Sequence, residues 1–199
     1  KDAARAVHLK KRFMKIGKML GMKVKVIVTD GSQPIGNGIG PLLEMLDVIS
    51  VLKNAPDAPT DLRDKAIMES GILLELTGKA RKGSGKKMAE HLLNSGAAYR
   101  KFQQIVKAQG AKRIPKLAKF RIDVEATTAG IVKAIDNKNI AHIARLAGAP
   151  KDPTAGLFIH KKIGDRVKKG EALYTIYAGS EERLKYAAEF AKKTGYEIK

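Results

Sequence analysis

Apolar side chains at helical spacing open the chain, and lysines occupy many of the positions between them. Val7, Phe13 and Ile16 fall on one side of a predicted helix that ends at Gly21. Neither an initiator methionine nor a capping residue precedes Lys1, so we expect this helix to begin upstream of the printed sequence.

A strand, a glycine-rich loop and a second helix come next. Residues 23–29 (KVKVIVT) are rich in β-branched side chains, which predicts a strand. Residues 30–40 (DGSQPIGNGIG) predict a loop, and Pro41 suits the first turn of a helix over residues 41–52. This order of helix, strand, loop and helix is typical of an α/β sheet domain.

Three more helices complete the first half of the chain. Apolar spacing predicts them over residues 61–77, 84–94 and 97–108, with Ser84 as the cap of the second. Helices stop and strands begin at residues 110–115, which therefore mark the best domain boundary.

The second half has a different texture, with short β-branched runs separated by Gly, Asp and Asn. We predict one domain over residues 1–112 and another over residues 113–199. In the latter, two helices are expected over residues 139–147 and after the cap Ser180. The predicted strands cover residues 119–124, 129–135, 157–160, 172–177 and 196–198.

Composition narrows the class of protein. The 199 residues contain no cysteine, which excludes disulfides and thiolate metal sites, and no apolar run reaches the roughly 18 residues of a membrane span. We expect a soluble, cytoplasmic protein. The 39 Lys and Arg residues against 20 Asp and Glu give a net charge of +19. Such a charge is suited to binding polyanions. However, the basic residues are spread over every segment of the chain, which favours the interpretation that they form the charged surface of a heat-adapted protein.

Two features could carry chemistry. The glycines of residues 36–40 lie between a strand and a helix, where backbone N–H groups can bind an anion. A tight turn with positive φ explains them equally well. Four histidines are far apart and lack acidic neighbours at ligand spacing, so we interpret them as surface or structural residues: His8, His91, His142 and His160.

The segment 156–178 pairs two short strands around the turns Gly164–Asp165 and Lys169–Glu171. It resembles half of the barrel-sandwich hybrid fold of biotinyl and lipoyl carriers, and residues 129–133 resemble the other half. No acceptor lysine stands at a hairpin tip in the required sequence context, so the carrier hypothesis fails.

Residues 30–44 (DGSQPIGNGIGPLLE) resemble the D-x-x-Q-P-[LI]-G-x-x-[VI]-G-x-x-x-E segment of the thymidine and pyrimidine-nucleoside phosphorylases. The order of elements and the later KIGDRVKKGE stretch (residues 162–171) are also similar to that family. The resemblance covers essentially the whole chain. The lysine-rich, cysteine-free composition suggests an archaeal, thermophilic branch whose relatives act as AMP phosphorylases.

The resemblance implies part of a mixed-sheet α/β domain followed by a C-terminal barrel-sandwich hybrid, β-hammerhead-like α+β domain. It also implies a dimeric pentosyltransferase of nucleotide metabolism that needs no cofactor. Phosphate attacks the sugar of a nucleoside or nucleoside monophosphate, giving free base and sugar 1-phosphate. The family's K-x-S-x-G-G phosphate segment precedes the Q-P-I-G loop, whereas the similar residues 81–85 follow it. We therefore expect no catalytic residue in this chain, and an inactive protein when it stands alone.

One site could remain here by resemblance. In some relatives a monovalent or other hard cation is held by carbonyl oxygens at the positions of Ile35 and Gly38 and by a carboxylate at the position of Asp47. Those relatives carry Glu where this chain has Asp47, and an ordinary helix-surface acid is the alternative interpretation. We expect neither a membrane nor a nucleic-acid partner for the enzyme. The rival hypothesis is a stand-alone basic module that binds RNA or another polyanion.

Overall fold

The computed structural model describes residues 3–110, 113–192 and 195–199. The chain divides into two compact units, of which the first joins Lys1–Asp30 to Asp64–Ser95 and the second joins Gly31–Arg63 to Gly96–Lys199. The predicted domain boundary between residues 112 and 113 adjoins residues 111–112, which lie outside the described residues, and the predicted domain division stays a prediction.

Four strands of the second unit form an antiparallel sheet in the order β1-β4-β6-β2. A three-stranded antiparallel sheet has the order β5-β3-β7. The chain is thus a mixed α/β protein, as predicted, whereas the barrel-sandwich hybrid arrangement remains a prediction. The strands are β1 (Gly38–Ile39), β2 (Phe120–Glu125), β3 (Gly130–Ile135), β4 (Gly156–Ile159), β5 (Arg166–Val167), β6 (Ala172–Ala178) and β7 (Tyr196–Ile198).

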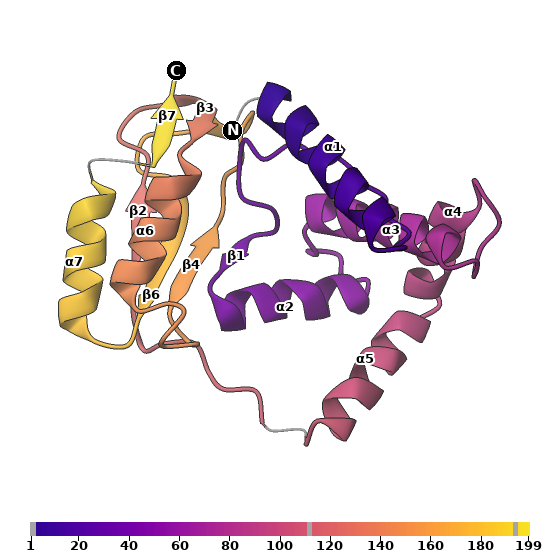
Figure 1. Ribbon diagram of the computed structural model, residues 1–199. Coiled ribbons are helices and arrows are strands. Elements are labelled where there is room, and N and C mark those ends of the chain that lie inside the picture. Colours follow the sequence, from indigo (N-terminus) through magenta and orange to yellow (C-terminus); the bar gives the residue numbers. More distant parts are fainter. Residues whose placement is uncertain (1–2, 111–112, 193–194) are drawn as a thin grey trace. The chain divides into compact units, whose positions relative to one another are not determined.

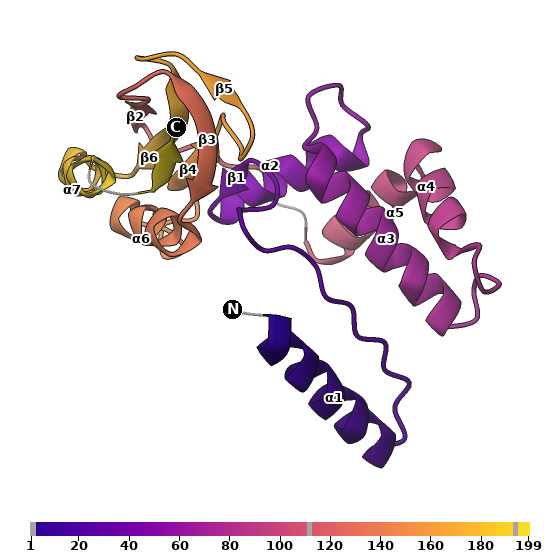
Figure 2. The ribbon, with the colours of Figure 1, turned by 90° about the horizontal axis from the view of Figure 1, so that it is seen from above.

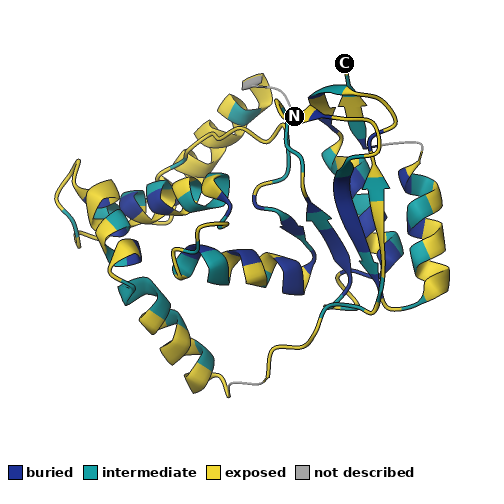
Figure 3. Cartoon of the chain, turned by 180° about the vertical axis from the view of Figure 1, so that it is seen from behind, coloured by how far each residue is buried: buried dark blue, intermediate teal, exposed yellow. Residues whose placement is uncertain are grey.

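Two helices, α6 (Asn137–Ala147) and α7 (Glu181–Ala191), pack against each other and against the four-stranded sheet (Figure 2). Helix α7 contacts β2 and β6, and α6 contacts β4 and β6. The core between them is almost completely closed to solvent, and its buried side chains concentrate on β4, β6 and α6 (Figure 3). Its largest fully buried side chains include Val132, Ile140, Ile143, Leu157 and Ile176.

Helix caps explain where the predicted helices begin. The Ser180 hydroxyl accepts the Arg183 N–H at 3.3 Å at the start of α7, which confirms the predicted cap. Ser84 stands at the predicted N-cap position of the helix Gly85–Asn94, but its hydroxyl donates to the Arg81 carbonyl at 2.7 Å and makes no cap hydrogen bond. Helix α6 begins two residues before the predicted position because Asp136 caps it.

The remaining helices of the second unit lie close to their predicted positions. Helices α2 (Pro41–Leu52) and α5 (Ala97–Ala108) both have the predicted bounds. Pro41 lies in the first turn of α2, as expected. The N-terminal residues of α3 (Thr60–Leu76), up to Arg63, also belong to this unit.

The first unit contains α1 (Ala3–Met19), the rest of α3 and α4 (Gly85–Asn94). The predicted strand over residues 23–29 is wrong, since this segment has no regular structure and pairs with no described strand. A strand requires a neighbour for its N–H and C=O groups, and the described residues of this unit include none. Apolar side chains remain exposed on α1 and on this segment, including Phe13 (59%) and Val28 (60%).

No helix within the described residues combines the length and the apolar character that crossing a bilayer requires.

Candidate functional site

The glycine-rich loop becomes an edge strand of the second unit's sheet. Its strand β1 pairs antiparallel with β4, so that Gly38 lies opposite Phe158 (Figure 1). The Ile159 N–H also donates to the Asn37 carbonyl at 2.7 Å. Gly156 has φ of +152°, and a Cβ atom there would lie 2.1 Å from the carbonyl oxygen of the β1 residue beside it. Only glycine therefore allows the loop to approach β4 this closely.

Carboxylates of the same unit bind the backbone N–H groups of this loop. The Asp47 Oδ2 atom accepts the N–H groups of Asn37 at 2.6 Å and Gly38 at 2.7 Å. The Asp61 carboxylate accepts the Gly36 N–H at 3.3 Å. Since Asp47 is only 6% exposed, its interpretation as an ordinary helix-surface acid is wrong. It is a buried acceptor that holds the loop.

These contacts decide between the two interpretations of the loop. Its N–H groups face carboxylates of the chain itself, including the Gly40 N–H that donates to Glu44 Oε1 at 3.0 Å. A bound anion would have to displace these carboxylates. Gly36 has φ of +70°, and a Cβ atom there would lie 2.7 Å from Asp47 Oδ2. The loop is therefore a tight structural turn whose glycines are required by φ and by close packing.

Lys162 contacts the loop from a position 126 residues away in the sequence. Its ammonium group donates to the carbonyls of Pro34, at 2.8 Å, and of Gly36, and to Asp61 Oδ2 at 3.1 Å. Sequence reasoning missed this residue, because a lysine in a chain this basic carries no signal of its own. The pairing of β1 with β4 is what brings Lys162 to the loop.

The residues predicted to hold a cation do line one pocket, of about 330 Å³. Ile35, Gly38 and Asp47 contribute to it together with Glu44 and Leu62. The Asp47 oxygen nearest the loop already accepts two N–H groups, and the described residues contain no cluster of three His, Cys, Asp or Glu side chains suited to a metal. The cation site stays a prediction.

The second glycine-containing segment, residues 81–85, also binds a carboxylate of its own unit. Glu75 Oε1 accepts the N–H groups of Gly83 at 3.0 Å and Gly85 at 2.9 Å. These are the donors that a phosphate cradle would use. These donors are already bound to a carboxylate of the chain, which agrees with the expectation from sequence order that this segment is not the family's phosphate segment.

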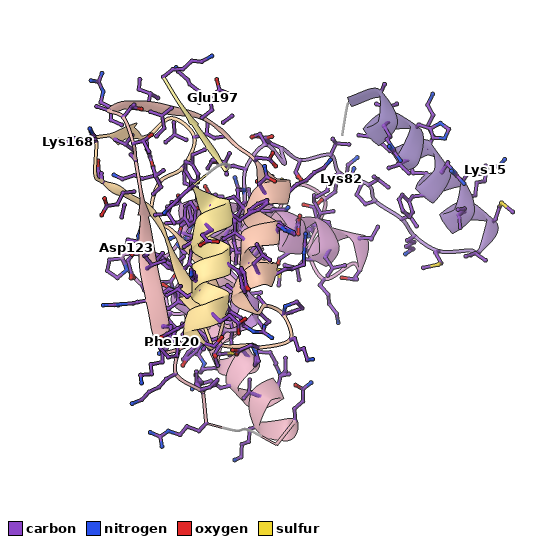
Figure 4. All side chains as sticks on the ribbon, turned by 90° about the vertical axis from the view of Figure 1, so that its left-hand side faces the viewer. Lys15, Lys82, Phe120, Asp123, Lys168 and Glu197 are labelled. Atoms are coloured by element: carbon purple, nitrogen blue, oxygen red, sulfur yellow. The ribbon has the colours of Figure 1, made fainter. Side chains whose placement is uncertain are left out.

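One histidine belongs to a chain of polar side chains across the sheet. The His160 Nε2 atom lies 2.8 Å from the Thr175 hydroxyl, which donates to Asp123 Oδ1 at 2.6 Å. Asp123 lies on β2, beside α7 (Figure 4). Because the only hydroxyl proton of Thr175 goes to the carboxylate, His160 must be the donor in the remaining bond. A histidine that donates a hydrogen bond to the threonine hydroxyl cannot remove its proton and activate it as a nucleophile. We therefore interpret the hydrogen-bonded row His160–Thr175–Asp123 as structural.

Two stacked tyrosines connect the two sheets. The rings of Tyr174 and Tyr196 are 5.6 Å apart, and the Tyr196 hydroxyl donates to the Lys161 carbonyl at 2.7 Å. Burial raises the pKa of both phenols, so both stay protonated at physiological pH.

Both a protein family and several curated proteins are similar to this chain. Residues 131–199 match the family described as "Pyrimidine nucleoside phosphorylase C-terminal domain". Among curated relatives, proteins of Legionella pneumophila (strain Paris), Ralstonia nicotianae and Rhodopseudomonas palustris share the name "Putative thymidine phosphorylase". They are 45%, 46% and 46% identical to this chain.

The matches extend far beyond the C-terminal domain. They cover 96%, 89% and 99% of this chain respectively, but only 37%, 35% and 39% of those proteins. The chain therefore spans little more than a third of the length of these relatives. All three organisms are bacteria, so the predicted archaeal and thermophilic origin receives no support.

Proposed function

We propose that this chain is part of a pentosyltransferase of the pyrimidine nucleoside phosphorylase family, because residues 131–199 match that family's C-terminal domain and the relatives are about 45% identical over nearly the whole chain. The reaction is phosphorolysis of a nucleoside N-glycosidic bond. A phosphate oxygen forms a bond to the sugar C1 atom while the C1–N bond breaks, and the base leaves with the bonding electrons and takes up a proton. The products are free base and sugar 1-phosphate.

The observation that carries this proposal is the identity of about 45% over nearly the whole chain, which includes the glycine loop and the first unit. The name shared by the relatives favours thymidine or another pyrimidine nucleoside as the substrate, with inorganic phosphate as co-substrate. AMP is the other substrate that we propose to test.

Within such an enzyme, we assign this chain a positioning role. The loop N–H groups of Asn37, Gly38 and Gly40 already bind carboxylates of the chain, as do those of Gly83 and Gly85. Phosphate is then held by groups outside these two loops. Catalysis of this kind depends on precise placement of phosphate and base, so a rigid support contributes even without contacting them.

The exposed apolar side chains of the first unit support the same proposal. Phe13 and Met19 on α1 are 59% and 76% exposed, and residues 23–29 have the composition of a strand but no described partner. In a protein of the relatives' length, we infer that additional chain covers these apolar side chains of α1. Assembly into a homodimer or larger homo-oligomer, and a bound hard cation, remain proposals for that longer protein.

The test is a chimera in which this chain replaces the matching region of the Legionella relative. Phosphate-dependent release of free base is measured with thymidine, uridine and AMP, for the chimera, the relative and the 199-residue chain alone. We expect base release by the chimera and none by the chain alone. A folded chimera that is inactive on all three substrates, beside an active relative, would refute the proposal. Tight RNA binding by the chain at physiological salt would then favour the basic binding module, given its charge of +19.

A further inference from the structure

Lys162 has a complete set of partners for a cation. An ammonium group has three N–H donors, and three acceptor oxygens surround it: the carbonyls of Pro34 and Gly36 and the carboxylate of Asp61. Carbonyl and carboxylate oxygens are also the ligands that hard cations prefer in proteins. The acceptors come from two separate segments, so one charge connects the glycine loop to the start of α3.

The backbone around Lys162 fixes the direction of its side chain. The Lys162 N–H donates to Asp165 Oδ2 at 2.8 Å, and the Asp165 N–H donates back to the Lys162 carbonyl at 3.1 Å. The next N–H, of Ile163, donates to Gln33 Oε1 of the glycine loop at 2.8 Å. The turn is therefore bonded both to itself and to the loop, and the ammonium group is held in place before any ligand is considered.

The neighbouring lysine provides a contrast. The Lys161 side chain is 22% exposed and that of Lys162 is 21% exposed, so burial does not distinguish them. Lys161 pairs with one carboxylate, that of Glu171, at 2.5 Å. A surface ion pair of this kind contributes little to stability, whereas two inward-facing carbonyls in addition to a carboxylate form a site.

We propose that Lys162 is a positioning residue whose ammonium group acts as a built-in cation for the glycine loop. Removing its side chain opens a site, formed by Pro34, Gly36 and Asp61, that accepts a small primary ammonium ion. Without a positive charge, the two carbonyls and the carboxylate face one another uncompensated, and the loop loses its contact with α3. This inference concerns the fold of the chain and holds whether or not the proposed reaction is correct.

The experiment compares Lys162→Ala with Lys161→Ala in the 199-residue chain. Alanine keeps the Cβ atom, so n-propylammonium replaces the missing atoms, while choline, at the same concentration, is too bulky to enter. The melting temperature is followed by near-ultraviolet circular dichroism of the tyrosines. We expect Lys162→Ala to lower it by about 3–10 °C and n-propylammonium to restore at least half of that loss. Lys161→Ala should lower it by less than about 2 °C and show no selective rescue.

Two further variants separate charge from volume. Lys162→Met fills the space without a charge, so it should lose stability and resist rescue because its side chain blocks the site. Lys162→Arg should also destabilise, because a planar guanidinium does not fit a site built for a compact ammonium group. If Lys162→Ala does not fold in choline, its refolding yield in n-propylammonium replaces the melting temperature as the readout.

A local measurement checks that the effect lies at the loop. Hydrogen exchange of the Asn37 and Gly38 amides should accelerate by roughly tenfold or more in Lys162→Ala and slow again with n-propylammonium. Equal responses to n-propylammonium and choline, or an unchanged melting temperature in Lys162→Ala, would overturn the proposal.

Discussion

Replacing Asp47 with alanine directly tests whether this carboxylate holds the glycine loop. Its Oδ2 atom accepts the N–H groups of Asn37 at 2.6 Å and Gly38 at 2.7 Å, and the residue is 6% exposed. In Asp47→Ala both donors lose their acceptor at a position that water reaches poorly. A buried donor left without a partner destabilises a protein more than the net value of its hydrogen bond.

The magnitude follows from these two bonds. Hydrogen bonds to charged groups contribute about 1.5–3 kcal/mol each, so Asp47→Ala, which removes two of them, should lower the free energy of unfolding by about 3–6 kcal/mol. For a chain of this length, that corresponds to roughly 6–24 °C in melting temperature. Asp47→Asn keeps an acceptor oxygen but loses the charge, so it should lower the free energy of unfolding by about 1–2 kcal/mol.

Tyrosine signals report on the correct part of the molecule. All five tyrosines lie in the second unit, which contains the loop, so urea unfolding followed by tyrosine circular dichroism measures that unit. Asp57→Ala is the matched control, because Asp57 is exposed and the substitution should stay within about 0.5 kcal/mol of the unchanged protein. If Asp47→Ala were as stable as Asp57→Ala, the carboxylate would not hold the loop.

Three further predictions follow from local geometry. Gly36→Ala should cost about 1–3 kcal/mol in urea unfolding, because φ is +70° and the added Cβ would lie 2.7 Å from a carboxylate oxygen; an unchanged midpoint would contradict this. Ser180→Ala should lower the free energy of unfolding in urea by about 1 kcal/mol, because it removes the cap hydrogen bond of α7. Ser84→Ala should leave that free energy almost unchanged, and equal losses for the two variants would refute the cap assignment. The hydrogen bond from Thr154 lowers the pKa of Asp152, so its stabilisation is complete above the ordinary aspartate pKa of about 3.9 and is lost as pH falls through the lowered value. Thr154→Val should therefore reduce the dependence of unfolding free energy on pH between about pH 5 and pH 2, and an unchanged slope would contradict it.

Local signals predicted helices well. Pro41 begins α2 at the predicted residue, and the Ser180 hydroxyl caps α7 as expected. Both depend on interactions within a few residues of sequence. Local sequence is not always sufficient, because the Ser84 hydroxyl donates to the Arg81 carbonyl instead of accepting an N–H group of the helix.

Features that depend on distant partners were harder to predict. Residues 23–29 have the composition of a strand, yet a strand forms only beside another, and the described part of the first unit has none. The role of Asp47 as a buried acceptor depends on the loop folding back over α2. Lys162 is 126 residues from the carbonyl of Gly36 that it contacts, and nothing in its local sequence marks it.

The central proposal, that this chain is part of a nucleoside phosphorylase, is tested most directly by the chimera with the Legionella relative. The measurement is thymine release from thymidine with and without inorganic phosphate. The account predicts phosphate-dependent release by the chimera, with sugar 1-phosphate formed in equal amount. A chimera that folds but releases no base from thymidine, uridine or AMP, while the relative remains active, would contradict it.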